Sequence, residues 1–414
     1  MSRWNEKYHD KFKRHSLSGQ LMDVRYLDAA WRKVRANRGS GGIDGETIES
    51  FEAKKGTELA EIRIQLKERR YKPQPVRRVY IPKPDGRQRP LGIPTIRDRV
   101  VQQTLKDLLE PIFEEIFLEG SHGYRPGKDA HQAMRKVQGY INRGYCWIVD
   151  ADIQGFFDHV NHRILMDLVR EKVADGRVLD LLESFLKCGV MNEGEFESTA
   201  EGTPQGGVVS PLLANIYLNH FDRRMGEEEF LLLRYADDFL IFCKTEEDAQ
   251  KARGMAEKIL KEELKLNLNP EKTRILNIRR SNGNFLGFAF SARYLSPSEN
   301  SIEEYKDAIR HMTRRQQPKN ASMVILKINP VIRGWGRYFG YRTMITPLRE
   351  LDRWTRMRVR CFKAHRRKDW IISRRIPEEK NLVSLMSQRT DGPAPRKGDG
   401  QTRAVYSKWV RTVR

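Results

Sequence analysis

Apolar side chains recur at helical spacing near the amino-terminal end of the chain. Leu21, Val24, Leu27, Trp31 and Val34 fall on one face of a helix. The stretch NRGSGG follows directly, and its glycines are typical of a helix end. The pattern therefore predicts one amphipathic helix that ends before this stretch.

Two short apolar runs come next, VRRVYI and PLGI, and they predict strands over residues 76–81 and 90–93. Pro84-Asp85-Gly86 lies between them and predicts a turn. Lys83 and Arg89 flank that turn. Cations at a hairpin end are usually just solvated, but a hairpin that closes on a triphosphate needs the same arrangement.

The stretch YCWIVDADIQGFFDHVNH starts with an apolar run that is typical of a buried strand. Alternation places Asp150 and Asp152 on the same face, so spacing alone does not choose between them. Phe157 lies five residues after Asp152 and past Gly155, which permits a sharp bend, whereas five residues after Asp150 comes Gly155 itself. A polymerase needs a carboxylate at a strand end and a bulky ring against the nucleotide sugar. This favours Asp152, with Asp150 as a supporting neighbour, although Phe156 or Phe157 could each belong to the core.

Further along, EGTPQGGVVSPLLANIYLNHFD predicts a glycine loop followed by a helix. Ser210 is a good N-cap and Pro211 a good first residue, so we expect the helix over about residues 211–221. Gly206 and Gly207 would let the backbone approach a ligand closely. A loop that only turns the chain is the ordinary explanation for such glycines.

The stretch LLLRYADDFLIF consists of two apolar runs that meet at Asp237 and Asp238. This pattern predicts a β-hairpin, and a polar turn is the ordinary reason for an Asp-Asp pair there. The pair needs support from elsewhere in the chain before it indicates a site.

Near residues 296–301, SPSENS precedes a new helical pattern, and we expect a boundary there. In the last long helical stretch, cations recur at steps of three and four and form one stripe, without an acidic residue in it. The stripe consists of Arg349, Arg353, Arg356, Arg360, Lys363 and Arg367. The residues expected to face the core are Leu348, Leu351, Val359 and Phe362. A solvated face is the usual explanation for such a run, but six cations in line favour phosphate binding.

Charge makes a polyanionic partner the simplest reading of the whole chain. Its 414 residues carry 77 Lys and Arg against 55 Asp and Glu, a formal charge of +22. From Ser301 onward there are 28 basic and 10 acidic residues, so most of the excess lies in the last quarter. Nucleic acid fits this excess best. An anionic membrane is a weak alternative, because no stretch has the length of a spanning helix and the first residues lack a signal peptide's apolar core.

The cysteines give no sign of a metal or disulfide framework. Cys146, Cys188, Cys243 and Cys361 lie far apart, and the chain has no Cys-x-x-Cys. We therefore expect a reducing, cytoplasmic location of bacterial type, in association with RNA.

In this order, the motifs resemble those of the reverse transcriptases encoded by bacterial group II introns, the retroelement maturases. The resemblance runs from about Leu21 to Trp370. The matching stretches are IPKPDGRQRPLGIP, GYRPGKDAH, DADIQGFFDHVNH, GTPQGGVVSPLLANIYL, RYADDFLIF, LNLNPEKTRI and FLGFAF. It implies an α+β right-hand polymerase: fingers and palm with an antiparallel sheet packed by helices, then an α-helical thumb. The expected parts are an amino-terminal extension and start of the fingers (1–75), fingers and palm (76–295), a thumb of maturase type (296–370) and a basic tail (371–414).

The resemblance also implies a reaction and roles for single residues. The enzyme would copy RNA into DNA from deoxynucleoside triphosphates, with two Mg²⁺ ions, or Mn²⁺ as a substitute, held by three carboxylates from separate strands. These are Asp152, Asp237 and Asp238. Crowded without metal, they should repel one another and raise at least one pKa. The implied nucleotide contacts are Lys83 and Arg89 at the triphosphate, Phe157 against the sugar, Gln205 and Gly206 beside the templating pair, and Lys272 near the pyrophosphate.

The implied partners are an RNA template, a DNA or RNA primer and structured intron RNA, which the protein would bind as a splicing cofactor. Two alternatives stay open: mainly an RNA-binding maturase, or a host-adopted reverse transcriptase used in defence or repair. Fuller relatives carry a cysteine-bearing endonuclease after the thumb. Here 44 residues follow Trp370 and no cysteine lies beyond Cys361, so we expect no endonuclease and at most a reduced DNA-binding tail.

Overall fold

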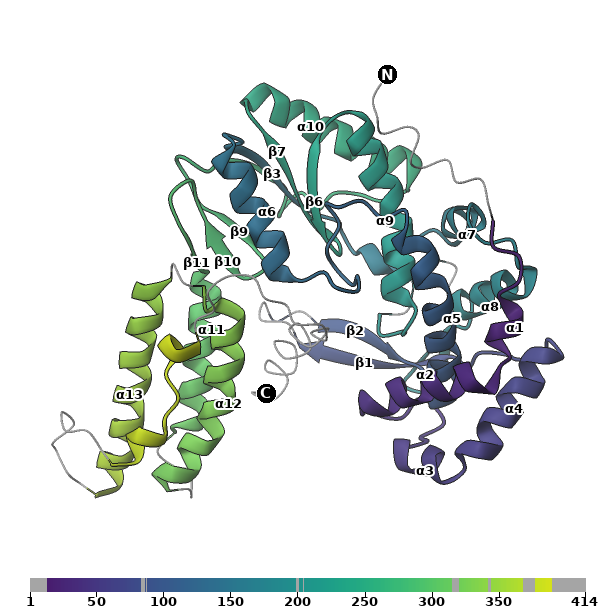
Figure 1. The fold of residues 1–414 in the computed structure, drawn as a ribbon, viewed down its shortest axis with the longest axis horizontal. Coiled ribbons are helices and arrows are strands. Elements are labelled where there is room, and N and C mark those ends of the chain that lie inside the picture. Colours follow the sequence, from purple (N-terminus) through teal and green to yellow (C-terminus); the bar gives the residue numbers. More distant parts are fainter. Residues whose placement is uncertain are drawn as a thin grey trace. The chain divides into compact units, whose positions relative to one another are not determined.

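The computed structural model is mixed α+β (Figure 1). It describes residues 13–82, 86, 88–198, 201–203, 205–314, 320–341, 344–367 and 377–388, without the side chains of 364–367. The chain divides into two compact units. The first consists of Met1–Arg125, Val149–Phe242 and Glu247–Arg274, and the second of Pro126–Ile148, Cys243–Glu246 and Ile275–Arg414.

The first unit begins with helices. They are α1 (Ser18–Leu21), α2 (Val24–Ala36), α3 (Ile48–Ala53), α4 (Lys55–Lys67) and α5 (Ile96–Glu114). The expectation of a single first helix is wrong, because the chain breaks at Asp23, whose carboxylate accepts a 2.8 Å hydrogen bond from the backbone of Arg25 and caps α2. Val24 is accordingly 41% exposed, while Leu27 and Trp31 are buried as predicted.

A hairpin of two antiparallel strands follows, β1 (Val76–Pro82) and β2 (Gln88–Ile93), as the sequence predicts. It belongs to a four-stranded sheet with the order β2-β1-β4-β5, where β4 is Val190–Asn192 and β5 is Glu195–Glu197. Of the predicted turn residues, Pro84 and Asp85 lie outside the described residues, and so does the flanking Lys83.

A second four-stranded sheet has the order β6-β7-β3-β8. Its strands are β3 (Trp147–Asp152), β6 (Leu231–Tyr235), β7 (Asp238–Cys243) and β8 (Arg274–Asn277). β6 and β7 are antiparallel, and Tyr235 stands opposite Asp238. The predicted hairpin is thus confirmed, with Ala236 and Asp237 as its two-residue turn. After β3 comes a short 3₁₀ helix, η1 (Phe156–Asp158).

Helices cover the rest of the first unit. They are α7 (His162–Arg170), α8 (Gly176–Leu186), α9 (Ser210–Glu227), α10 (Glu246–Lys258) and a π-helical turn, η2 (Ile259–Glu263). Two details of the α9 prediction are wrong. Ser210 is the first helical residue and Val209 the N-cap, and the helix continues to Glu227 rather than ending near Phe221. The extension follows from burial, since Phe221, Asp222 and Met225 all face the interior.

The second unit contains α6 (Ala130–Asn142) and a small antiparallel sheet of order β11-β10-β9. The strands are β9 (Gly283–Phe285), β10 (Phe288–Phe290) and β11 (Leu295–Pro297). Ser298 then caps α11 (Glu299–Met312) by accepting a 3.2 Å hydrogen bond from Ser301 N–H, where the sequence predicts a new helix.

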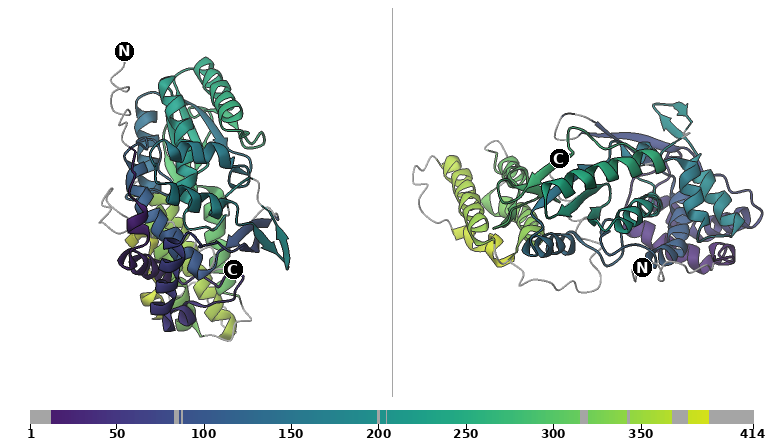
Figure 2. Two further views of the ribbon diagram at one scale, coloured as in Figure 1. Left: turned by 90° about the vertical axis from the view of Figure 1, so that its right-hand side faces the viewer. Right: turned by 90° about the horizontal axis from the view of Figure 1, so that it is seen from above.

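Three helices dominate the rest of the second unit: α11, α12 (Ala321–Phe339) and α13 (Ile345–Arg367). They lie side by side in Figure 1 and again, from yellow-green to green, in Figure 2. Two short 3₁₀ segments follow, η3 (Pro377–Asn381) and η4 (Leu385–Gln388), and both contact α12. The packing of α11 against α12 centres on aromatic side chains. Tyr305 and Trp335 are fully buried, and their ring centroids lie 5.1 Å apart.

Candidate active site

The structure brings together carboxylates that are far apart in the sequence. Asp152 is the last residue of β3, Asp238 is the first residue of β7, and Asp237 occupies the turn before it. Asp238 hydrogen-bonds with Asp152 and also feels the charge of Asp237. Two neighbouring strands of one sheet therefore bring Asp152 and Asp238 together, with Asp237 next to Asp238 in the turn.

Crowding changes the acidity of this cluster. Asp238 is exposed at the surface, but protein atoms around its carboxyl displace part of its hydration, and this loss raises its pKa. The charge of Asp237 and the hydrogen bond with Asp152 raise the pKa of Asp238 further. The sequence predicts a raised pKa from repulsion among the carboxylates, and here repulsion adds to a larger effect of lost hydration.

Lys272 neutralises part of that charge. Its Nζ lies 2.8 Å from Asp152 Oδ2, and Asn269 Nδ2 donates to the same oxygen at 3.3 Å. Partial burial by itself would lower the pKa of Lys272, but the hydrogen bond with Asp152 and the charges of Asp152, Asp238 and Asp237 outweigh it and raise the pKa. The lysine that was predicted to lie near the pyrophosphate thus contacts the carboxylate cluster directly.

Asp150 has a different partner. It is on the same face of β3 as Asp152, as alternation predicts, but Nε and Nη2 of Arg274 donate to its Oδ2 at 3.0 and 2.9 Å. Burial raises the pKa of Asp150 in spite of this arginine. Asp150 thus pairs with Arg274 and Asp152 with Lys272, and the sequence pattern did not single out Arg274.

The donor set suits a hard divalent cation. Mg²⁺ prefers carboxylate oxygens, and a cation would remove the repulsion that raises the pKa of Asp238. In the part of the chain that the structure describes, no group of three or more His, Cys, Asp or Glu side chains surrounds one point as metal ligands.

The two rings after β3 differ in exposure. Phe156 is buried and contacts Tyr217, with ring centroids 6.4 Å apart, whereas Phe157 is half-exposed. Gly155 adopts the left-handed conformation, φ +55°, that the predicted bend requires. Of the two candidates, Phe156 belongs to the core and Phe157 has an accessible ring.

The glycine loop before α9 is joined to the β1–β2 hairpin. Gly92 N–H donates a 2.7 Å hydrogen bond to the Gln205 carbonyl. Gly206 has φ +120°, and a Cβ there would stand 2.4 Å from the Gly92 carbonyl oxygen, so only glycine fits. Arg89 lies on β2 with its side chain exposed.

A buried ion pair lies behind the Asp237–Asp238 turn. Arg234 on β6 is 0% exposed and Asp222 on α9 is 3% exposed, and Arg234 Nη2 lies 2.5 Å from Asp222 Oδ2. The sequence pattern did not single out either residue. The available signal was a lone arginine among the apolar residues of LLLRY, since a buried charge in a strand requires a partner.

The cationic stripe on α13 is only partly as expected. The predicted core residues Leu348, Leu351, Val359 and Phe362 are buried. Arg349 and Arg353 are exposed and Arg356 half-exposed, and none of the three pairs with an acidic side chain among the described residues. The side chain of Arg367 lies outside the described residues.

The expectation of a stripe without acidic partners is wrong for two of its members, because η3 supplies two glutamates. Arg360 Nε and Nη2 donate to Glu379 at 2.5 and 2.9 Å, and this hydrogen bonding raises the pKa of Arg360. Lys363 Nζ lies 2.6 Å from Glu378 Oε2. The end of the stripe nearer the carboxyl terminus is therefore already neutralised.

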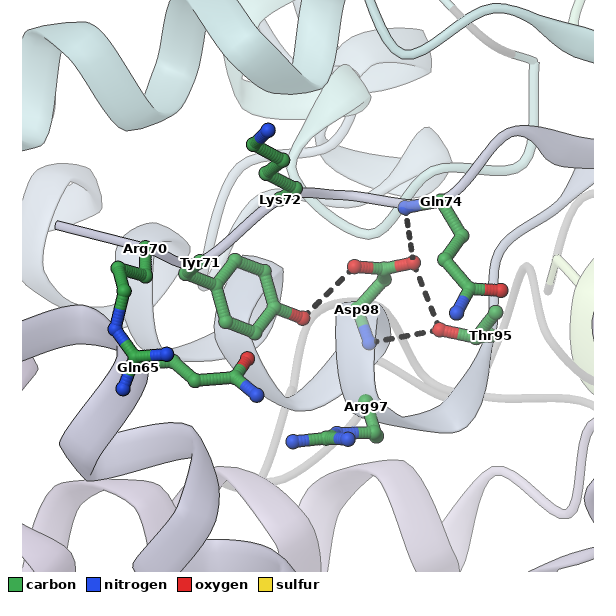
Figure 3. A pocket seen from close by; sticks show the side chains of 8 residues that line it. All are labelled: Gln65, Arg70, Tyr71, Lys72, Gln74, Thr95, Arg97 and Asp98. Atoms are coloured by element: carbon green, nitrogen blue, oxygen red, sulfur yellow. Dashed lines mark hydrogen bonds between the residues drawn. The ribbon is translucent and has the colours of Figure 1, made fainter.

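A cavity of about 280 Å³ lies elsewhere in the first unit, and none of the predicted site residues lines it (Figure 3). Asp98 accepts hydrogen bonds there from Tyr71 Oη (2.8 Å), Thr95 Oγ1 (2.7 Å) and Gln74 N–H (3.1 Å). Burial raises the pKa of both Asp98 and Tyr71. The satisfied hydrogen bonds around Asp98 identify it as part of the framework that joins α5 to the segment before β1.

Two predictions from composition can also be compared with the structure. No disulfide joins the four cysteines, all of which are described. None of the described helices combines the length and the apolar character that crossing a bilayer requires.

The comparisons with known proteins agree with these elements. Residues 81–290 match the family described as reverse transcriptase (RNA-dependent DNA polymerase), and this range holds Asp150, Asp152, Asp237 and Asp238. Residues 302–376 match the maturase-specific domain of group II introns. The chain belongs to the group II intron reverse transcriptase/maturase family and contains an RNA-dependent DNA polymerase domain.

Among similar proteins, Protein YkfC of Escherichia coli (strain K12) is 36% identical over 61% of this chain and 77% of its own length. Group II intron-encoded protein LtrA of Lactococcus lactis subsp. cremoris is 31% identical over 66% of this chain. The alignment covers only 55% of LtrA. A solved structure of telomerase from Candida albicans with a fragment of telomeric RNA is 12% identical, with a TM-score of 0.45 over 88% of this chain and 69% of that one.

Proposed function

We propose that this protein copies RNA into DNA by phosphoryl transfer at the cluster of Asp152, Asp237 and Asp238. The observation that carries the proposal is the meeting of these carboxylates from β3 and the β6–β7 turn, together with the raised pKa of Asp238. Three ionised carboxylates held this close repel one another unless cations are bound between them. Such crowding is common at metal-dependent sites.

The three aspartates would hold two Mg²⁺ ions, with Mn²⁺ as a substitute. Such ions stabilise charge on the attacking and leaving oxygens of a phosphoryl transfer. Asp150, already paired with Arg274, would keep β3 and β8 together beside the site. Lys272, which contacts Asp152, is close enough to the cluster to meet the pyrophosphate of a bound nucleotide.

The other nucleotide contacts extend this site. Lys83 and Arg89 on the β1–β2 hairpin would bind the triphosphate, where negative charge is densest. The half-exposed ring of Phe157 would exclude the ribose 2′-hydroxyl. Gln205 and Gly206 would lie beside the templating base, since their loop is hydrogen-bonded to β2 and has room for backbone alone at Gly206.

We also propose the domain limits that the motifs suggest: fingers and palm over 76–295, a thumb over 296–370, and flanking segments 1–75 and 371–414. The thumb, with the cations of α13, would bind template–primer and intron RNA as a splicing cofactor. The match of residues 302–376 to the maturase-specific domain supports this second role.

Primer extension on an RNA template tests the first proposal. Asp152→Asn, Asp237→Asn and Asp238→Asn should each reduce extension by at least about a thousandfold, because each removes a ligand for the ions that carry the chemistry. RNA affinity, measured by filter binding, should stay within about twofold, since no phosphate contact is touched.

Asp150→Asn is the matched control, on the same strand face two residues away. It should retain most of the activity, since its partner is Arg274. Extension by Asp237→Asn at near the wild-type rate would contradict the site. A larger loss for Asp150→Asn than for Asp152→Asn would shift the first ligand by one strand period.

Sequencing the RNA that copurifies with the protein tests the second proposal. A structured intron among the bound RNA would support the maturase role. A mixture of cellular RNAs without an intron would instead favour a host-adopted enzyme for defence or repair.

A further inference from the structure

Arg234 makes five hydrogen bonds inside the first unit, as many as its guanidinium has N–H groups. Nε and Nη2 donate to the Asp222 carboxylate at 2.7 and 2.5 Å. Nη2 also donates to Ser121 Oγ at 2.9 Å, and Nη1 donates to Asn215 Oδ1 at 3.1 Å. The fifth bond, from Nη1 to the Ala236 carbonyl at 2.9 Å, reaches the turn that carries Asp237.

That turn is strained without a clamp. Ala236 has φ +61°, a left-handed conformation that favours glycine in the first position of a two-residue hairpin turn. An alanine stays there only if its surroundings favour this backbone over the alternatives. The bond from Arg234 to the Ala236 carbonyl fixes the orientation of the peptide unit that leads into Asp237.

The opposite side of the turn packs closely against the segment 120–123. Residues 120–123 run along β6, with Arg234 N–H donating to the Gly120 carbonyl and His122 N–H donating to the Arg234 carbonyl, both at 2.9 Å. A Cβ on Gly123 would stand only 2.2 Å from the Ala236 nitrogen. Asn215, a partner of Arg234, donates from Nδ2 to the Gly123 carbonyl at 2.8 Å and ties this segment to the same network.

We propose that Arg234 is a positioning residue that sets the direction of the Asp237 and Asp238 carboxylates through the Ala236 carbonyl. The inference rests on the proposed function of these two aspartates. Apolar residues of similar size often replace a buried ion pair without loss of stability, so stability alone does not account for the network around Arg234. The bond to Ala236 is the part of the network that a purely structural ion pair would not require.

Two changes separate geometry from folding. Arg234→Lys keeps a cation for Asp222 but cannot make all five bonds, and Arg234→Met with Asp222→Leu replaces the pair with apolar side chains. Both should reduce kcat for single-nucleotide addition by ten- to a hundredfold, while KM for the nucleotide and affinity for template–primer change by less than about threefold. Arg224→Lys is the matched control on α9: its side chain pairs with Glu227 and Glu263 at the surface, and kcat should be unchanged.

A readout without turnover completes the test. Binding of Mn²⁺ to the free enzyme, followed by electron paramagnetic resonance, should weaken at least fivefold in Arg234→Lys. Ala236→Gly removes the steric reason for a clamp, so adding it to Arg234→Lys should restore at least a third of kcat and the Mn²⁺ affinity.

Wild-type kcat and Mn²⁺ affinity in a folded Arg234→Met/Asp222→Leu protein would overturn the positioning role. Loss of kcat that Ala236→Gly leaves unrestored would also overturn it, because the clamp would then not act through the turn. If Asp237→Asn itself retains full extension, the proposed function fails instead, whatever Arg234 does.

Discussion

The β6–β7 turn and helix α13 both concentrate charge, but they hold it in opposite ways. Behind the turn, the Arg234 guanidinium is fully buried, and all its N–H groups are used by neighbours from three segments. Along α13, Arg349, Arg353 and Arg356 extend from one helix face and pair with no acidic side chain among the described residues.

This difference indicates that the buried network controls the geometry of the carboxylates, whereas the exposed cations control the affinity for nucleic acid. A buried network has one arrangement, so a small change there alters the direction of the carboxylates and hence the reaction itself. Exposed cations act through their charge, so their effects are graded, additive and weakened by salt. We therefore expect substitutions at the turn to affect kcat and those on α13 to affect binding.

The largest effect should come from Gly123→Ala, which breaks the close packing at the turn. The added Cβ would lie 2.2 Å from the Ala236 nitrogen. Because neither atom can move without its backbone, the turn must shift. We expect a loss of about 1–3 kcal/mol in the free energy of unfolding and of more than about a hundredfold in primer extension, because a small misplacement of the reacting groups has an effect of this size. Gly254→Ala, on α10 with nothing near its Cβ, is the control and should stabilise the protein by about 0.5–1 kcal/mol. Equal behaviour of the two variants would show that the turn tolerates displacement.

The next effect concerns the open part of the stripe. Replacing Arg349, Arg353 and Arg356 together with Gln should lower template–primer affinity about a hundredfold at 0.15 M salt and reduce the logarithmic salt slope by about two to three units, because each lost phosphate contact removes about one. Gln keeps helix propensity, so the thermal midpoint should hold. Single-nucleotide addition in a saturated complex should be nearly unchanged. An unchanged salt slope would place this face of α13 in solvent.

A smaller effect, about tenfold, is expected in sugar selection. Phe157→Val should admit ribonucleotides, because a smaller side chain leaves space for the 2′-hydroxyl. The ratio of kcat/KM for deoxynucleotide over ribonucleotide measures it. Phe156→Val is the neighbouring control: it should lower stability, since Phe156 is buried, and leave the ratio unchanged. The reverse pattern would exchange the two roles.

The smallest effect should follow Lys363→Gln, in the neutralised part of the stripe. Because Glu378 already lies 2.6 Å from Lys363, this cation has little attraction left for phosphate. The salt slope should change by less than about half a unit and template–primer affinity by less than about twofold. A fall of a whole unit would mean that nucleic acid displaces Glu378 from Lys363.

The sequence was sufficient to predict structure where the pattern of a single helix or hairpin determines it. Periodicity alone predicted the buried face of α13, and apolar runs around two aspartates predicted the β6–β7 hairpin. It failed where two weak local signals competed: Asp23 caps a new helix within a continuous apolar pattern, and Ser210 begins α9 rather than capping it.

The spacing of residues along the sequence could not predict interactions between segments that are far apart in the chain. Arg234 meets Asp222 from another element, and nothing in the stripe of α13 indicates that η3 returns with Glu378 and Glu379. Alternation and the hairpin pattern pointed to Asp152 and Asp238, which the structure places in hydrogen-bonding contact. The contact of Lys272 with Asp152 could not be predicted, because it depends on how the segment after η2 packs beside β3.

The hydrogen bond from Gly92 N–H to the Gln205 carbonyl links a hairpin strand to the glycine loop before α9. Any displacement of β2 that keeps this bond carries Gln205 and Gly206 with it. Residues proposed to grip the triphosphate and residues proposed to lie beside the templating base would then change position in step. A mispaired base that prevented the loop from moving would then also prevent the hairpin from moving toward the triphosphate. Selection of the correct base and binding of the triphosphate would be coupled through this one hydrogen bond.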